Sequence, residues 1–135
     1  MIVFITVFIN VFCACIGNSP VIENNDPGII NITVLNNGTP IIADPVLLDR
    51  ADPDMSGITI ILENSWLYDE GSIIWWISGT SIRENRAEFF IDAYDPAFKN
   101  LGFYYINVEA QIDGAPFKGT FTLNIFNSNE ENDEQ

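Results

Sequence analysis

Histidine is absent from this chain of 135 residues. Histidine is the side chain whose ordinary pKa lies closest to neutral pH, and it is also the commonest metal ligand. Ser-His-Asp and Cys-His catalysis are therefore excluded for this chain alone. Carboxylate pairs could in principle hydrolyse a glycoside, but no Asp or Glu in the sequence is marked as buried or tuned for that chemistry. We expect a protein that is not an enzyme and holds no cofactor.

Cysteine and basic residues are also scarce. Cys13 and Cys15 are separated by one residue in the apolar N-terminal stretch, where they are poorly placed to cross-link a domain. Five Lys and Arg stand against 19 Asp and Glu, for a formal net charge of −14. Nucleic-acid binding needs clustered cations, and anionic lipid repels an acidic surface. The charge predicts no nucleic-acid partner and allows membrane attachment only through a lipid or a hydrophobic anchor.

The N-terminal stretch has the features of a targeting signal. An apolar run from Ile2 to Gly17 is short for a transmembrane helix and typical of the h-region of a secretory signal. The sequence Phe-Cys-Ala-Cys at 12–15 resembles a bacterial lipobox, which implies Cys15 as the lipid acceptor. An ordinary cleaved signal and an uncleaved anchor are the alternatives for residues 1–15. All three predict export to the bacterial cell envelope.

Three further segments follow from composition. We expect residues 16–27 to form a tether, because the stretch from Asn18 to Gly28 is polar and rich in turn formers. Residues 127–135 hold acids, amides and serine without apolar groups, and we expect a disordered acidic tail. The span 28–126 between them has the size of one β-sandwich.

The span 28–126 alternates apolar and polar residues in several short stretches. This period of two predicts strands, and the Asp113-Gly114 pair predicts a tight hairpin between the last two. We expect an all-β fold, a single immunoglobulin-like antiparallel sandwich of about seven strands. The strand-like stretches are IINITVL, ITIIL, SIIWWI, AEFFIDA, GFYYINVEA and GTFTLNIF.

The order IIWWISG, EFFIDA, LGFYYINVEA and DG resembles a bacterial immunoglobulin-like domain of the PKD or cell-surface-repeat type. In that resemblance Trp75 matches the buried tryptophan of the third strand. Gly102-Phe103-Tyr104 matches the tyrosine corner, whose hydroxyl bonds to nearby backbone. The resemblance implies a role in adhesion, scaffolding or protein interaction.

The stretch DPDMSGITIILE at 52–63 has the ligand spacing of an EF-hand calcium loop. Prolines interrupt the would-be entering helix, and a strand over residues 58–62 would hold Glu63 roughly 20 Å from Gly57. The EF-hand interpretation therefore fails. A weak calcium site formed by Asp49, Asp52 and Asp54 remains a hypothesis, in which Asp92 or Asp95 could add a further carboxylate.

Aromatic residues outside the inward series give the other candidate site. Trp66, Trp76 and Tyr105 could stack on a sugar or anchor a protein partner, and we expect Tyr68 to lie outside the inward series with them. They could equally pack across neighbouring strands and only stabilise the sheet. The alternative function is thus a carbohydrate- or calcium-binding module, with an unknown protein or glycan as partner.

Overall fold

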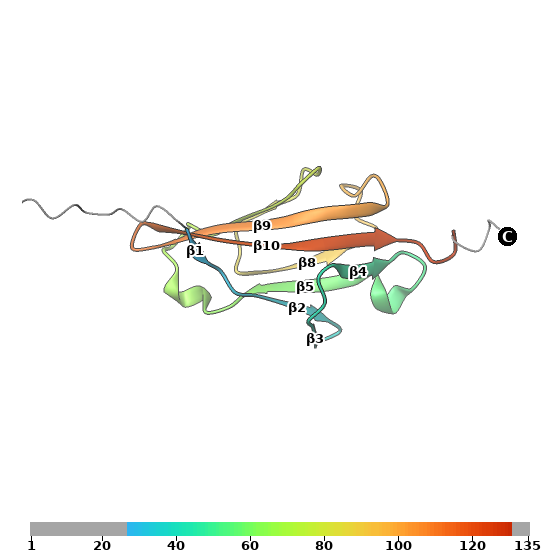
Figure 1. The fold of residues 1–135 in the computed structure, drawn as a ribbon, viewed down its shortest axis with the longest axis horizontal. Helices are drawn as coiled ribbons and strands as arrows, with labels where there is room; N and C mark the ends of the chain where they lie inside the picture. Colours follow the sequence, from blue (N-terminus) through green and yellow to red (C-terminus); the bar gives the residue numbers. More distant parts are fainter. Residues whose placement is uncertain (1–26, 131–135) are drawn as a thin grey trace, which may run out of the picture.

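The computed structural model describes residues 27–130, which form two facing β-sheets (Figure 1). The strands are β1 (Gly28–Ile29), β2 (Ile32–Asn36), β3 (Thr39–Ile41), β4 (Val46–Asp49), β5 (Gly57–Leu62), β6 (Ile74–Ile77), β7 (Arg83–Glu84), β8 (Glu88–Asp92), β9 (Gly102–Ile112) and β10 (Ala115–Phe126). Two single 3-10 turns, η1 (Pro53–Met55) and η2 (Ser65–Leu67), lie in the loops. No helix among these residues is both long and apolar enough to cross a membrane.

Sheet A has the order β1-β10-β9-β6-β7, with β4 also paired to β10, and sheet B has the order β3-β2-β5-β8. All pairs are antiparallel except β1 and β4, which run parallel to β10. The predicted immunoglobulin-like sandwich is confirmed. The predicted count of about seven strands is wrong, because residues 27–130 form ten. Strands β1, β3 and β7 have only two or three residues, too few to show an alternation, and β4 has buried residues at successive positions.

The alternation places the core as predicted. Along β5, for example, every second residue is buried, and its neighbour β8 follows the same rule. So do β6, most of β9 and the second half of β10 in sheet A. Trp75 is 1% exposed, and its ring meets Phe89 edge to face at 5.2 Å between centroids. The indole N–H donates to the carbonyl oxygen of Arg86 at 2.9 Å, so this buried polar group is satisfied.

The tyrosine at the start of β9 bonds to backbone, as expected. The Tyr104 hydroxyl donates to the carbonyl oxygen of Asn100 at 2.6 Å and accepts from the Asn100 N–H at 3.3 Å. Its ring packs edge to face on Phe98, which is 2% exposed. These contacts tie the β8–β9 loop to the core.

The β9–β10 hairpin turns at Asp113 and Gly114, whose φ angles of 50° and 77° match the predicted tight turn. The loop after η2 folds against this turn. The Asp69 carboxylate accepts the N–H groups of Asp113 and Gly114, both at 2.9 Å, and the Asp69 N–H donates to Gln111 at 2.7 Å. We call this set of bonds the hairpin clamp.

The start of the chain runs along the edge of β10. The Ile30 N–H donates to Lys118 at 2.8 Å, and a Cβ on Gly119 would lie 3.1 Å from the Ile30 carbonyl oxygen, so glycine permits this close approach. Strand β1 lies toward one end of the long axis and the tip of β10 at the other (Figure 1).

Candidate functional site

The outer face of sheet A carries large apolar side chains. On β9, Phe103 and Tyr105 point outward and are 65% and 56% exposed, and on β6 Ile74 is 45% exposed. Trp76 on β6 lies on the same face as Tyr105, because it pairs with Asn107, which is two residues after Tyr105 on β9. Its side chain is half-buried. We call Ile74, Trp76, Phe103 and Tyr105 the outer strip. The structure thus brings two of the three candidate aromatics onto one face and adds Phe103 to them.

The rings of the outer strip are not paired with other rings. Residues 27–130 hold three close ring pairs, and none of them includes Trp76, Phe103 or Tyr105. Phe103 and Tyr105 are two positions apart on one strand, so their attachment points are separated by roughly 7 Å. Exposed rings at this spacing are available to a partner, since aromatic side chains contribute much of the contact energy in protein interfaces.

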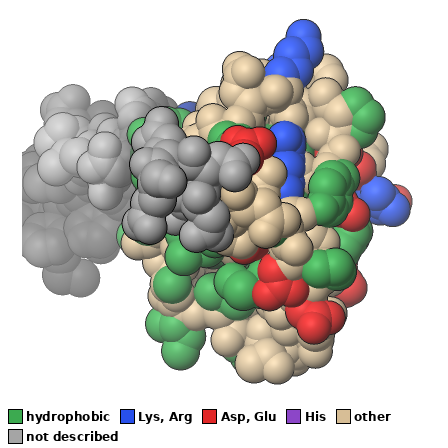
Figure 2. Space-filling view, turned by 90° about the vertical axis from the view of Figure 1, so that its right-hand side faces the viewer, with side chains coloured by type: hydrophobic (Ala, Val, Ile, Leu, Met, Phe, Trp, Pro, Cys, Tyr) green, Lys and Arg blue, Asp and Glu red, His purple; other side chains and the backbone are tan. Residues whose placement is uncertain are grey.

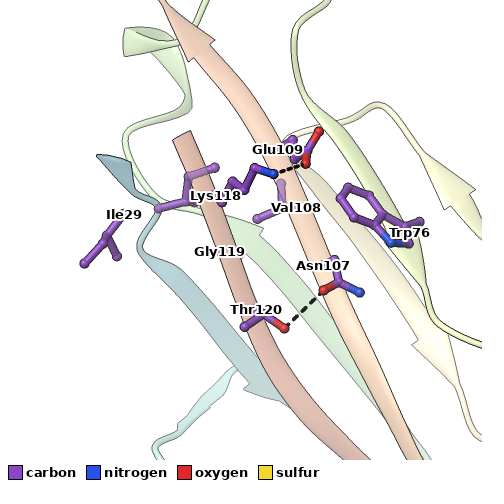
Figure 3. A pocket seen from close by; sticks show the side chains of 9 residues that line it. Ile29, Trp76, Asn107, Val108, Glu109, Lys118, Gly119 and Thr120 are labelled. Atoms are coloured by element: carbon purple, nitrogen blue, oxygen red, sulfur yellow. Dashed lines mark hydrogen bonds and ion pairs between the residues drawn. The ribbon is translucent and has the colours of Figure 1, made fainter. Parts of the chain in front are cut away.

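A groove of about 450 Å³ adjoins the outer strip at Trp76 (Figure 3). It crosses β6, β9, β10 and β1, and its size falls within the range usual for small-ligand sites. The residues that line it are Ile29, Ile30, Trp76, Asn107, Val108, Glu109, Lys118, Gly119 and Thr120. Trp76 forms one wall in Figure 3, with polar side chains of β9 and β10 beside it.

The polar side chains of the groove are paired but keep spare hydrogen-bonding capacity. The Lys118 ammonium lies 2.8 Å from Oε1 of Glu109, so the two charges balance each other. The Thr120 hydroxyl donates to Ile106 at 2.9 Å, and the amide of Asn107 donates to neighbouring oxygens. The second Glu109 oxygen and the remaining Lys118 protons can still bind a ligand hydroxyl. The groove is therefore neutral overall and offers both donors and acceptors.

The third candidate aromatic lies elsewhere. Trp66 is on η2 and is 80% exposed, and it is not part of the outer strip or the groove. The expectation that Tyr68 lies outward is wrong, because its ring packs against the core, edge to face on Phe117 at 6.0 Å between centroids. Burial raises the pKa of its hydroxyl. Trp66 thus serves as a matched exposed tryptophan outside the outer face of sheet A.

The candidate calcium ligands lie at the ends of β4 and β8 and in the loops that follow them, at the end of the sandwich toward which β10 runs, the end seen in Figure 2. We call the five carboxylates Asp49, Asp52, Asp54, Asp92 and Asp95 the acidic pole. Figure 2 shows acidic side chains at separate places on this end, among hydrophobic ones. Within residues 27–130, no group of three or more metal-ligating side chains comes together.

Three of these carboxylates cap their own turns. Asp52 accepts the N–H of Asp54 at 2.9 Å at the start of η1, and Asp92 accepts the N–H of Tyr94 at 2.8 Å. Asp95 does the same for Ala97 at 2.9 Å. Strand β5 begins at Gly57, so the helix-flanked calcium loop is excluded, as the prolines predicted.

Asp49 is the buried charge of the described chain, at 6% exposure. Its Oδ1 accepts the N–H groups of Ala51 and Ser128 at 2.8 and 3.1 Å. Burial on its own would raise the pKa of Asp49, but hydrogen bonds from the Ser128 hydroxyl and the two N–H groups outweigh it and hold that pKa below 3.8. Asp49 thus fastens residues 127–130, the first part of the expected tail, to the end of β4.

Cys15, the predicted lipid acceptor, lies outside the described residues, as do 1–26 and 131–135. Nothing in the geometry bears on it. The predictions of a signal or anchor at 1–15 and of a tether therefore stay predictions.

Comparison with known proteins gives little that bears on function. No family model matches the chain, and no curated protein matches it. A solved structure that does match is the endo-beta-1,4-mannanase from Thermotoga petrophila, at 9% identity and a TM-score of 0.46. The match covers 78% of this chain but only 22% of the mannanase chain. A likeness at this level says nothing about what this chain binds or catalyses.

Proposed function

We propose that this protein is a non-catalytic interaction domain, exported to the bacterial cell envelope and anchored there by lipid on Cys15. The observation that carries the interaction role is the outer strip. Phe103 and Tyr105 stand exposed on the outer face of sheet A, with Trp76 half-buried on the same face, in a chain with a net charge of −14. Exposed apolar side chains beside a few charged ones, Arg83, Glu109 and Lys118, suit adhesion to, or scaffolding of, another envelope protein.

A photo-crosslinking experiment tests the interaction role. A photoreactive phenylalanine analogue replaces Tyr105 in the full chain, produced in a bacterial host, and a matched variant carries it at Trp66. We expect one discrete adduct from position 105 and none from position 66, because only position 105 lies on the outer strip. Equal labelling from both positions, or none from either, would argue against a docking role for this face.

Lipid labelling tests the anchor separately. In the same host we expect the wild-type chain to carry a fatty-acid label and to partition into the detergent phase. Both properties are expected to be lost in Cys15→Ala. An unlabelled, freely soluble wild type would refute lipidation while leaving the interaction role standing. The two halves of the proposal can thus fail independently.

The groove beside Trp76 supports a second candidate, the binding of a neutral glycan. The indole offers a flat apolar surface to the C–H face of a sugar, and Glu109 and Lys118 offer hydrogen bonds to its hydroxyls. The paired charges favour a neutral ligand, because the net charge of −14 repels an acidic polysaccharide.

A glycan array compares the wild type with Trp76→Ala and Trp66→Ala. We expect a neutral oligosaccharide signal that Trp76→Ala abolishes and Trp66→Ala leaves unchanged. Cooperative thermal unfolding of both variants checks that the fold is intact. An array without any neutral glycan signal for the wild type would dismiss this candidate.

A further inference from the structure

Strand β8 forms an open edge of sheet B. The sheet order ends at β8, and no further strand of residues 27–130 pairs with it there. The opposite edge, β3, has three residues and contains Pro40, which cannot donate a backbone hydrogen bond. The edge strand β7 of sheet A has two residues. With five residues and no proline, β8 is the more capable template for another strand.

The register identifies which backbone groups of β8 are free. Bonds from Ala93 N to Ser56 O at 2.7 Å and from Leu62 N to Ala87 O at 2.8 Å bracket the β5–β8 pair. In an antiparallel pair the bonded positions alternate, so odd-numbered residues of β8 bond to β5. The even-numbered ones, Glu88, Phe90 and Asp92, direct N–H and C=O away from β5, and of these groups the Asp92 carbonyl oxygen already accepts the Asp95 N–H at 3.0 Å.

The side chains of these three positions share the outer face of sheet B. Phe90 is 64% exposed, Glu88 is exposed and Asp92 is half-buried. A Cβ on Gly57 would lie 2.3 Å from Cζ of Phe90, so the ring lies over Gly57 on β5. The ring therefore leans back over the sheet and leaves the backbone edge clear, with one carboxylate on each side.

We propose that β8 binds an extended segment of a partner protein as an added antiparallel strand, with the pattern basic–x–apolar–x–basic. In such a pair, directly opposite side chains lie on the same face about 5 Å apart. The central apolar residue would meet Phe90, and the two basic residues would meet Glu88 and Asp92. Main-chain hydrogen bonds supply affinity, and the alternating side chains supply specificity.

Charge disfavours a second copy of this chain as the added strand. An antiparallel pair of β8 strands centred on Phe90 would place Glu88 of each copy opposite Asp92 of the other. Like charges at directly opposite positions destabilise a pair, and each chain carries a net charge of −14. The partner strand is therefore basic and comes from a different protein.

A synthetic peptide tests this proposal on the full chain. The probe is the blocked heptapeptide Thr-Lys-Thr-Val-Thr-Lys-Thr, and the matched control has Glu in place of both Lys. We expect the Lys peptide to bind with a Kd below about 1 mM and the Glu peptide not to bind. Among the described residues, the Glu88 side chain makes no hydrogen bond or ion pair that a substitution would remove. Glu88→Lys is therefore expected to weaken binding of the Lys peptide at least about threefold.

Amide hydrogen exchange distinguishes strand addition from simple electrostatic adherence. Upon binding we expect slower exchange at the Phe90 N–H, while the Phe89 N–H, already bonded to β5, stays unchanged. Phe90→Thr keeps the N–H and is expected to retain part of the affinity, whereas Phe90→Pro removes the N–H and is expected to lose it. No binding at millimolar Lys peptide, or binding without protection of Phe90, would overturn the proposal, even if Phe90→Pro failed to fold.

Discussion

The hairpin clamp predicts that Asp69 stabilises the fold out of proportion to its position in a surface loop. Replacing it by alanine removes the acceptor for the N–H groups of Asp113 and Gly114, both held at 2.9 Å. Those two donors lie in a tight turn with positive φ, where no other protein group replaces the carboxylate. The loop that follows η2 would lose these two bonds to the β9–β10 hairpin and keep the backbone bond from the Asp69 N–H to Gln111 and the bond from the Gln111 N–H to the Ser72 hydroxyl.

The size of the effect follows from the character of the two bonds. A hydrogen bond to a charged group contributes about 1.5–3 kcal/mol when it is sheltered, and less when water can replace the partner. Both bonds of Asp69 lie at an exposed turn, so we expect Asp69→Ala to cost about 1–2 kcal/mol in total. For a folded body of this size, that lowers Tm by roughly 4–10 °C.

Urea unfolding and amide exchange of the full chain measure the effect. We expect a lower unfolding midpoint with an unchanged slope, and faster exchange at the Asp113 and Gly114 amides. Asp69→Asn, which keeps one acceptor oxygen, is expected to lose about half as much stability. A loss below about 0.3 kcal/mol in Asp69→Ala, with exchange unaltered at both amides, would refute the reasoning.

Three further predictions concern stability. Tyr104→Phe removes the bond to Asn100 and is expected to cost about 0.5–1.5 kcal/mol in urea unfolding, whereas the exposed Tyr105→Phe stays within about 0.5 kcal/mol of wild type. Because the pKa of Asp49 is lowered, its contribution is present above pH 3.8 and is lost as the pH falls below it. The stability gap between wild type and Asp49→Ala should therefore narrow in acid, and a pH-independent gap would contradict this. Millimolar calcium is expected to leave Tm unchanged, since the carboxylates of the acidic pole do not converge. A rise in Tm with calcium would contradict this and support the calcium site.

Features that depend on the local alternation of apolar and polar residues could be predicted from the sequence. The inward series of β5, β6, β9 and β10 and the turn at Asp113 follow from a period of two and from turn chemistry, and all are confirmed. Strand β4 was not anticipated, because VLLD does not alternate. Its pairing with β10 is also a contact between segments 77 residues apart, which no local pattern reveals.

The candidate site was harder to predict, because exposure on a sheet depends on which strands become neighbours. Trp76 and Tyr105 could be placed outward, but their shared face depends on the β6–β9 register. The outward position of Phe103 follows from its strand alternation, yet nothing local says that this face stays uncovered. Arg50 is a similar case. It resembles an ordinary surface base but donates to the carbonyl oxygens of Ala93 and Phe98.

The parallel pairing of β1 and β4 with β10 has a mechanical consequence. Since these strands run in the same direction, a pull on residue 27 against a pull on residue 130 drags β10 lengthwise past its two partners. The bonds along this seam, such as Ile30 N to Lys118 O and Arg50 N to Phe126 O, are then strained together in shear and not peeled apart one after another. We therefore expect a pull between residues 27 and 130 to meet more resistance than a pull that separates the strands sideways.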